Sequence, residues 1–155
     1  MARRGLFLDL DGTLADSLPA MEAAYRALLR RFGREGSVAE FQSLNGPPAA
    51  VIVERIAKAH ALSVSRDELL TTYRDLVMQA HAAAPPAAGA RQILERARKH
   101  EWTVALVTSA ASQDARDWLA RVGLAEFVSV VVGGDEVRRG KPDPEPYRVA
   151  LQRTG

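Results

Sequence analysis

The pattern of hydrophobic and polar positions divides the chain into a short strand, a long helical segment and a region where elements alternate. Residues 5–10 read Gly-Leu-Phe-Leu-Asp-Leu, a brief apolar run typical of a strand buried on both faces. Over 17–82 the apolar residues recur at helical spacing, so we expect only helices there. The Ala- and Pro-rich stretch 82–90 is expected to be a linker. Two later apolar runs, 103–108 and 127–132, predict further strands.

Helical patterns alternate with these later strands. We expect helices over 87–99 and 112–122, and a last helix that starts at Pro144. Ser17 is expected to be the N-cap of the first long helix. Alternating strands and helices favour a parallel sheet with helices on its faces, so the prediction is an α/β fold with a Rossmann-like sheet and an all-helical insertion. The expected domains are residues 1–15 with 86–155 for the sheet and residues 16–85 for the helical insertion.

Composition excludes several classes of protein. The chain has 155 residues, of which 47% are hydrophobic, and this is too many for a disordered chain. No apolar run approaches the roughly 18 residues that a membrane span needs, so no membrane partner is expected. A net charge of +2 is too small to predict a nucleic-acid partner. The absence of cysteine excludes disulfides and thiol nucleophiles. No signal peptide is visible, so a cytoplasmic enzyme is expected.

Acidic, hydroxyl and basic side chains follow the predicted strands at the points where ligands bind to open α/β sheets. Asp9 and Asp11 end the first strand one residue apart, and two carboxylates this close repel each other unless a cation lies between them. Carboxylate and carbonyl oxygens suit Mg²⁺. The alternative for Asp11 and Gly12 is an ordinary Asp-Gly turn. Asp9 is harder to explain structurally, because it places a charge within an apolar run.

The next two strand ends contribute a hydroxyl and an amine. Thr108 and the backbone N–H groups after it are suited to binding a phosphate. The alternative is that Thr108, Ser109 or Ser112 caps the following helix. Lys141 alone would be expected on the surface, but Pro142 stiffens its loop and allows the amine to be directed at the other two segments.

Three segments together resemble a known family. They read DLDGTL at 9–14, VTS at 107–109, and GGDEV at 133–137 followed by GKPDP at 140–144. Their order and spacing resemble the first three motifs of the haloacid dehalogenase-like (HAD) phosphohydrolases. The helical insertion occupies the place of the helical cap in that superfamily. The sequence DSLP at 16–19 is similar to that of phosphoglycolate phosphatase-like members.

The resemblance implies a role for each motif residue. It makes Asp9 the nucleophile that becomes an aspartyl phosphate and Asp11 the general acid and base. It implies that Thr108 hydrogen-bonds a phosphoryl oxygen and that Lys141 offsets the negative charge. It also implies Mg²⁺ as cofactor, held by the Asp9 carboxylate and the Asp11 carbonyl. The remaining candidates for binding substrate or phosphate are Gly12, Thr13, Ser109 and Ala110.

The family's fourth motif, which completes its metal site, is not found before Gly155. The chain is therefore expected to be a C-terminally truncated form that binds Mg²⁺ weakly. In the family, the strand before this motif pairs beside the first strand. Its absence predicts an unpaired apolar edge at 6–8 and self-association through it.

The expected function is Mg²⁺-dependent hydrolysis of a small phosphorylated metabolite, most like that of phosphoglycolate phosphatase. Two alternatives stay open: a sugar phosphomutase of the same superfamily and a non-catalytic module that binds phosphate. Metal ligation by His60, His81 or His100 is not expected, because they are far apart in polar, helix-like sequence. Surface positions, or positions on the face of the helical insertion, are expected for them.

Overall fold

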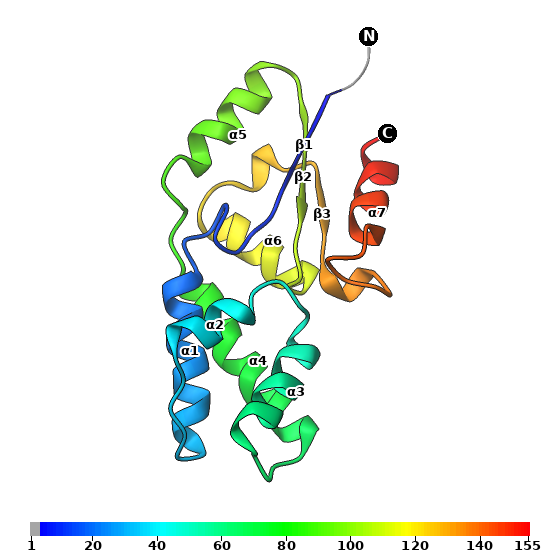
Figure 1. The fold of residues 1–155 in the computed structure, drawn as a ribbon. Helices are drawn as coiled ribbons and strands as arrows, with labels where there is room; N and C mark the ends of the chain where they lie inside the picture. The colour runs from blue at the N-terminus through cyan, green and yellow to red at the C-terminus, as the bar shows by residue number, and fades with distance from the viewer. Residues whose placement is uncertain (1–3) are drawn as a thin grey trace.

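A computed structural model describes residues 4–155, and its centre is a three-stranded parallel sheet (Figure 1). The strands are β1 (Gly5–Leu8), β2 (Thr103–Val107) and β3 (Val130–Val132), in the spatial order β1-β2-β3. β2 lies in the middle and is almost entirely buried. Because all three strands are parallel, their carboxyl ends meet at one edge of the sheet.

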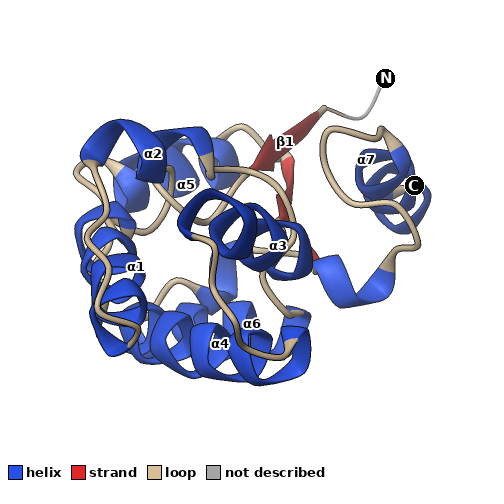
Figure 2. Ribbon diagram, turned by 60° about the horizontal axis from the view of Figure 1, so that its bottom comes forward, coloured by secondary structure: helices blue, strands red, loops and turns tan. Residues whose placement is uncertain are grey.

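Four helices between β1 and β2 form what we call the helical block, which lies at the carboxyl ends of the strands (Figures 1 and 2). Two helices cover one face of the sheet, and the last helix packs on the other face against β2 and β3. The helical block comprises α1 (Leu18–Arg31), α2 (Val38–Ser43), α3 (Ala49–His60) and α4 (Arg66–Ala83). The others are α5 (Ala90–Lys99), α6 (Ser112–Arg121), α7 (Glu145–Thr154), and the short 3-10 helices η1 (Ala125–Phe127) and η2 (Gly134–Glu136).

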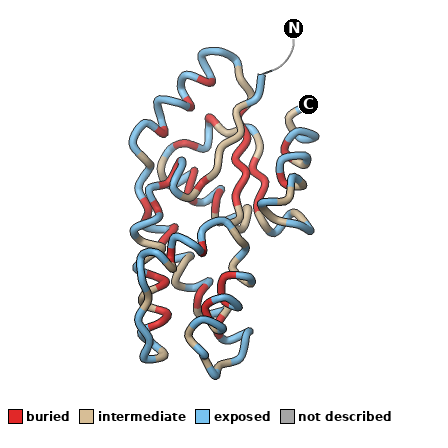
Figure 3. The backbone as a smooth tube through the Cα atoms, in the orientation of Figure 1, coloured by how far each residue is buried: buried red, intermediate tan, exposed pale blue. Residues whose placement is uncertain are grey.

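The sheet region and the helical block each contain buried positions (Figure 3), and the buried hydrophobic residues form three separate clusters. Leu106 and Trp118 belong to the cluster between the sheet, α5 and α6, while Val107 and Ala150 belong to the cluster under α7. The helical block has its own cluster, with Tyr25 at its centre. The predicted α/β fold with a parallel sheet is therefore confirmed. No helix among the described residues is long and apolar enough to cross a membrane.

All three strands are shorter than the hydrophobic pattern predicts, β2 by one residue. The first ends at Leu8 rather than at residue 10, because the Leu10 carbonyl accepts backbone hydrogen bonds from Leu14 and Ala15 in a tight turn. The run 127–132 begins with η1, and only its last three residues pair with β2. Apolar runs mark buried chain, but they do not distinguish a strand from the buried turn that leads into it.

β1 lies at an edge of the sheet and, within residues 4–155, it pairs with β2 alone. Leu6, Phe7 and Leu8 are partly buried by contacts with the clusters on the two faces. The backbone edge that faces away from β2 presents N–H and C=O groups without a neighbouring strand, which favours association between chains. Self-association through this edge stays a prediction.

Candidate active site at the strand ends

The first contact at the strand ends joins Asp9, which follows β1, to Lys141, which precedes α7. Lys141 Nζ lies 2.8 Å from Asp9 Oδ1 and 3.3 Å from the carbonyl oxygen of Val107 at the end of β2. The Leu10 amide also donates to Asp9 Oδ1, at 2.8 Å. Lys141 is only 16% exposed, whereas the Asp9 side chain is 40% exposed and opens to the cavity described below. The carboxylate is thus fixed through one oxygen while the other has no partner among the described residues.

The turn after Asp9 directs the second acid toward the helical block. Gly12 has φ of +71°, a left-handed conformation that permits the reversal, and the Gly12 amide donates to the Ala15 carbonyl. Asp11 and Gly12 line the cavity. Thr13 is exposed and does not line it, so the structure separates this candidate from the others.

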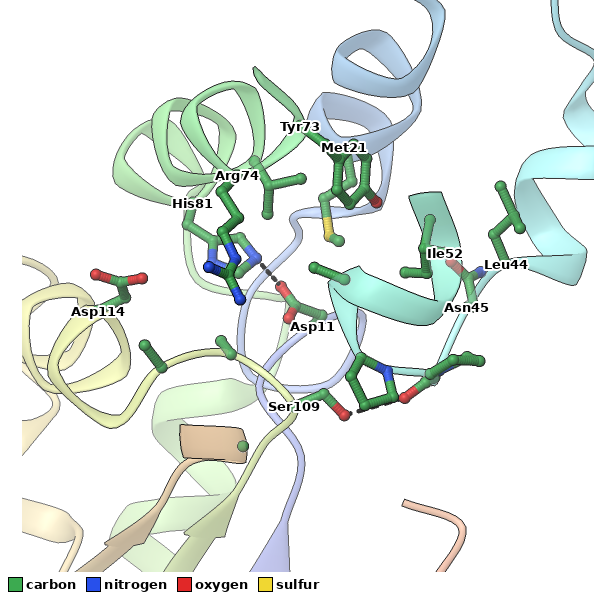
Figure 4. Close-up of a pocket in the computed structure, with 18 of the residues that line it drawn as sticks. Asp11, Met21, Leu44, Asn45, Ile52, Tyr73, Arg74, His81, Ser109 and Asp114 are labelled. Atoms are coloured by element: carbon green, nitrogen blue, oxygen red, sulfur yellow. Dashed lines mark hydrogen bonds and ion pairs between the residues drawn. The ribbon is translucent and has the colours of Figure 1, made fainter. Parts of the chain in front are cut away.

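Asp11 is held by two residues from outside its own turn. Ser17 Oγ donates to Asp11 Oδ1 at 2.6 Å, and His81 Nε2 on α4 lies 2.8 Å from the same oxygen (Figure 4). Ser17 precedes α1 as predicted, but its side chain does not cap that helix, because its hydroxyl is engaged by Asp11. Both Ser17 and His81 are buried, at 0% and 6% exposure.

The contact between His81 and Asp11 shifts the pKa of both groups. Burial by itself would raise the pKa of Asp11, but His81, the Ser17 hydroxyl and the charge of Lys141 together lower it below the usual 3.8. Burial would lower the pKa of His81, but the Asp11 carboxylate raises it above the usual 6.5. Each group thus favours the charged form of the other, an ionised carboxylate beside a protonated imidazole.

Sequence reasoning missed His81 as a residue of the site. It is one of the α4 residues that line the cavity, together with Tyr73 and Val77. Spacings of four and eight residues place side chains on one helix face, so this row was detectable. The sequence contained no signal that Asp11 lies opposite it, since that contact depends on how the helical block packs against the sheet.

The loop after β2 contributes buried and exposed hydroxyls. Thr108 is 2% exposed and is not one of the residues that line the cavity; its Oγ1 accepts a hydrogen bond from the Ala110 amide at 3.1 Å. Ser109 and Ala110 line the cavity, and Ser109 Oγ donates to the Gly46 carbonyl of the helical block at 3.0 Å. Thr108 and Ser109 therefore do not cap α6, which was the alternative role for them.

Asp135 caps α6 instead. Its Oδ1 accepts from the Ser112 amide at 2.7 Å, and its Oδ2 lies 3.2 Å from Ser112 Oγ. The glycines before it allow the loop after β3 to pack against the loop after β2: a Cβ on Gly134 would lie 2.5 Å from the Ser109 carbonyl oxygen. The GGD part of the third motif thus joins two loops of the site.

These groups surround a cavity of about 840 Å³ between the sheet and the helical block (Figure 4). Its floor carries the charged groups of the strand ends, and its walls in the helical block are mainly apolar. The apolar wall residues include Leu18, Met21, Phe41, Leu44, Ile52, Val77 and Met78. A cavity with an apolar wall and a few converging polar groups is typical of a small-molecule site.

The oxygen donors at the floor fit a hard divalent cation such as Mg²⁺. Asp9 Oδ2 and the backbone carbonyl of Asp11 accept no hydrogen bond from the described residues, so both are available as ligands. No group of three acidic, histidine or cysteine side chains with metal-site geometry occurs within residues 4–155. Two protein oxygens suit Mg²⁺, which usually keeps several water ligands.

Comparison with known proteins identifies the family. The family model for haloacid dehalogenase-like hydrolases matches residues 6–155. The chain is 32% identical to a phosphoglycolate phosphatase of Cereibacter sphaeroides and 34% identical to a validoxylamine A 7'-phosphate phosphatase of Streptomyces hygroscopicus. These matches cover 93% and 92% of this chain, and 68% and 67% of the relatives.

A solved structure supports the same assignment at the level of the fold. The crystal structure of a β-phosphoglucomutase from Clostridium difficile superposes with a TM-score of 0.81 at 18% identity. The match covers 99% of this chain and 71% of that one. The resemblance inferred from the three motifs is thereby confirmed, and this chain belongs to the haloacid dehalogenase-like hydrolase family.

Proposed function

We propose that the chain is a Mg²⁺-dependent phosphomonoester hydrolase that acts on a small phosphorylated metabolite through an aspartyl phosphate on Asp9. The observation that carries the proposal is the 2.8 Å contact between Lys141 Nζ and Asp9 Oδ1 at the floor of the cavity. It orients an acid whose second oxygen is open to a ligand. Relatives named as phosphatases, the phosphoglycolate phosphatase of Cereibacter sphaeroides among them, support the same reaction class.

In the first step a carboxylate oxygen of Asp9 attacks phosphorus. A P–O bond to Asp9 forms, and the bond from phosphorus to the alcohol oxygen breaks with its electron pair on that oxygen. Asp11 gives its proton to the leaving oxygen. In the free protein Asp11 is ionised, but an incoming phosphate dianion raises the pKa of a neighbouring carboxyl and so favours protonation of Asp11.

In the second step water attacks the phosphorus of the aspartyl phosphate. Asp11, now a carboxylate, accepts the proton of the water, while the bond between phosphorus and Asp9 breaks and inorganic phosphate leaves. The anchoring of Asp11 Oδ1 by Ser17 and His81 supports this role. With that oxygen held, Oδ2 is the atom that exchanges the proton.

The phosphoryl oxygens require donors around the attacked phosphorus. Lys141 supplies a positive charge, and the Ser109 backbone N–H at the cavity wall has no acceptor among the described residues, whereas the Ala110 N–H already donates to Thr108 Oγ1. The Thr108 hydroxyl accepts from Ala110 and keeps its own proton available for donation. The Gly12 and Thr13 N–H groups already donate within the turn, to the carbonyls of Ala15 and Leu10, so the expectation that they bind phosphate is not supported.

The metal would be held by a carboxylate oxygen of Asp9 and the backbone carbonyl of Asp11. When bound, Mg²⁺ reduces the repulsion between the anionic nucleophile and the anionic substrate. Lys141 contributes positive charge at Asp9 Oδ1.

We also propose that residues 16–85 act as a cap that excludes water during the reaction. Two polar contacts that tie the helical block to the sheet region support this role. His81 meets Asp11 on one side of the cavity, and Gly46 meets Ser109 on another.

The test is Mg²⁺-dependent hydrolysis of p-nitrophenyl phosphate by wild type and by Asp9→Asn. We expect turnover in the wild type, its loss in Asp9→Asn, and no change in Asp117→Asn, a control on α6 outside the cavity. Turnover that persists in Asp9→Asn would refute the nucleophile. Release of inorganic phosphate from a sugar phosphate separates hydrolysis from transfer to a second hydroxyl, which the mutase alternative requires.

A further inference from the structure

The cavity contains a basic side chain that the reaction at Asp9 does not use. Three basic residues line the cavity: Lys141, His81 and Arg74. Lys141 and His81 each lie 2.8 Å from an aspartate. Arg74, on α4, has no acidic side chain within 4.0 Å and no side-chain hydrogen bond to any of the residues 4–155. Its guanidinium is therefore available to a ligand.

Arg74 and the nucleophile belong to different parts of the cavity lining: Arg74 is on α4, whereas Asp9 lies at the strand ends. Arg74 and His81 are seven residues apart, which places them on one helix face about 10 Å apart along the helix axis. Figure 4 shows the Arg74 side chain extending from α4 into the cavity on the side where His81 meets Asp11. A ligand bound at Asp9 would thus meet Arg74 with its other end.

The surroundings of Arg74 would otherwise disfavour an anion at that end. Val77 and Met78, the next lining residues on α4, are apolar and cannot neutralise charge. Asp75 and Asp114 also line the cavity, and both would repel an anion. A guanidinium is always charged and pairs with carboxylate or phosphate through two parallel hydrogen bonds. A ligand with an anionic tail therefore depends on Arg74 for its neutralisation.

We propose that Arg74 binds a second anionic group, a carboxylate or a phosphate, at the end of the substrate remote from the phosphoryl group that reacts. The inference rests on the proposed function, since it assumes that the reacting phosphoryl group sits at Asp9. It narrows the substrate class to small phosphomonoesters with an anionic tail, and it makes Arg74 a specificity-determining residue.

The kinetic test compares substrates that differ only in the tail. 2-Phosphoglycolate and 2-hydroxyethyl phosphate form the carboxylate pair, and 1,3-propanediol bisphosphate and 3-hydroxypropyl phosphate form the phosphate pair. In Arg74→Gln we expect kcat/KM for an anionic tail to fall at least about tenfold, because a hydrogen bond to a charged group contributes about 1.5–3 kcal/mol. The two neutral tails should change less than about twofold. The substrate pair whose anionic member loses more kcat/KM shows whether Arg74 prefers a carboxylate or a phosphate tail. Arg55→Gln, on α3 outside the cavity, is the matched control and should leave kcat/KM unchanged for anionic and for neutral tails.

The proposal would be overturned if Arg74→Gln lowered kcat/KM equally for anionic and neutral tails, or if it left kcat/KM unchanged for both anionic tails. A binding test keeps it independent of turnover: calorimetric titration with phosphonoacetate and with methylphosphonate in the presence of Mg²⁺. Wild type should bind phosphonoacetate more tightly, and Arg74→Gln should lose that preference; a preference unchanged in Arg74→Gln would also overturn it. If Asp9→Asn still turns over while the preference is lost in Arg74→Gln, the proposed mechanism fails and the anion site stands.

Discussion

His81 Nε2 lies 2.8 Å from Asp11 Oδ1, so a side chain of the helical block touches the proposed acid of the sheet region directly. The contact is a close ion pair, and His81 Nε2 has no well-aligned hydrogen-bond partner among the described residues. Its energy is therefore sensitive to the protonation of both groups. Folding, docking of the helical block and ionisation of Asp11 are coupled through this one contact.

The first prediction concerns stability as a function of pH in the absence of divalent cations. The pKa of His81 is raised above 6.5 in the folded chain, so its stabilising contribution is complete below 6.5 and is lost as pH rises through the raised pKa. The pKa of Asp11 is lowered, so its contribution is present above 3.8 and is lost as pH falls through the lowered pKa. Thermal unfolding should show wild type more stable than His81→Gln near pH 6, with the difference shrinking toward pH 9.

His100→Gln is the matched control for this measurement. His100 follows α5, is exposed and stacks beside Trp102, away from any carboxylate of the cavity. Its substitution should leave the alkaline side of the stability profile unchanged. A difference between wild type and His81→Gln that is constant from pH 6 to pH 9 would contradict the ion pair.

The second prediction concerns Lys141. Substitution by Met removes the charge beside Asp9 while keeping the apolar stem, so we expect kcat to fall by about 10²–10³, the range for loss of one electrostatic group of an active site. Arg should not restore the rate, because its planar guanidinium does not fit where one amine meets both Asp9 and the Val107 carbonyl. Steady-state hydrolysis of p-nitrophenyl phosphate measures this, with exposed Lys99→Met as control. Full recovery in Lys141→Arg would contradict a specific role for the amine.

Much of the fold and part of the site could be predicted from local sequence. Asp9 and Lys141 are 132 positions apart, yet both follow strands, and the carboxyl ends of parallel strands meet at one edge. The fold class therefore predicted that both lie at the same edge, whereas the direction of the Lys141 amine depends on its loop. Their chemical roles stay predictions.

The rest depends on contacts that no local pattern encodes. His81 reaches Asp11 only because α4 packs its lining face toward the strand ends, and the orientation of one packed unit against another is set by many weak contacts. Asp135 is a similar case: it caps a helix that begins 23 residues earlier in the chain. Capping rules consider only neighbouring residues, and so they indicated Thr108, Ser109 or Ser112 instead.

The third prediction separates capping from metal binding at Asp135. Because Asp135 accepts from the Ser112 amide at 2.7 Å, Asp135→Ala should destabilise the fold by about 0.5–2 kcal/mol, the usual effect of losing an N-cap acceptor. Asp135→Asn keeps one acceptor oxygen and should lose less. Urea unfolding measures both, with Asp117→Ala on α6 as control. The Mg²⁺ concentration for half-maximal activity should not move; a marked increase would mean that Asp135 is a metal ligand.

The fourth prediction tests whether glycine is needed where the loops after β2 and β3 meet. In Gly134→Ala the new Cβ would lie 2.5 Å from the Ser109 carbonyl oxygen and 3.1 Å from its carbon. Both atoms are backbone, so the loop must move, and overpacking of this kind costs about 1–3 kcal/mol. Because Ser109 and Ala110 line the cavity, the same shift should raise KM for p-nitrophenyl phosphate.

Gly5→Ala provides the comparison for this substitution. A Cβ on Gly5 has its nearest neighbour at 3.4 Å, the Cε1 atom of the Phe7 ring. The free energy of unfolding measured in urea should therefore change by less than about 0.5 kcal/mol. If Gly134→Ala changed the free energy of unfolding and KM as little as Gly5→Ala does, the loops after β2 and β3 would have room to separate. The GGD segment would then have no part in fixing the Ser109 loop, and the need for glycine at 134 would lie elsewhere.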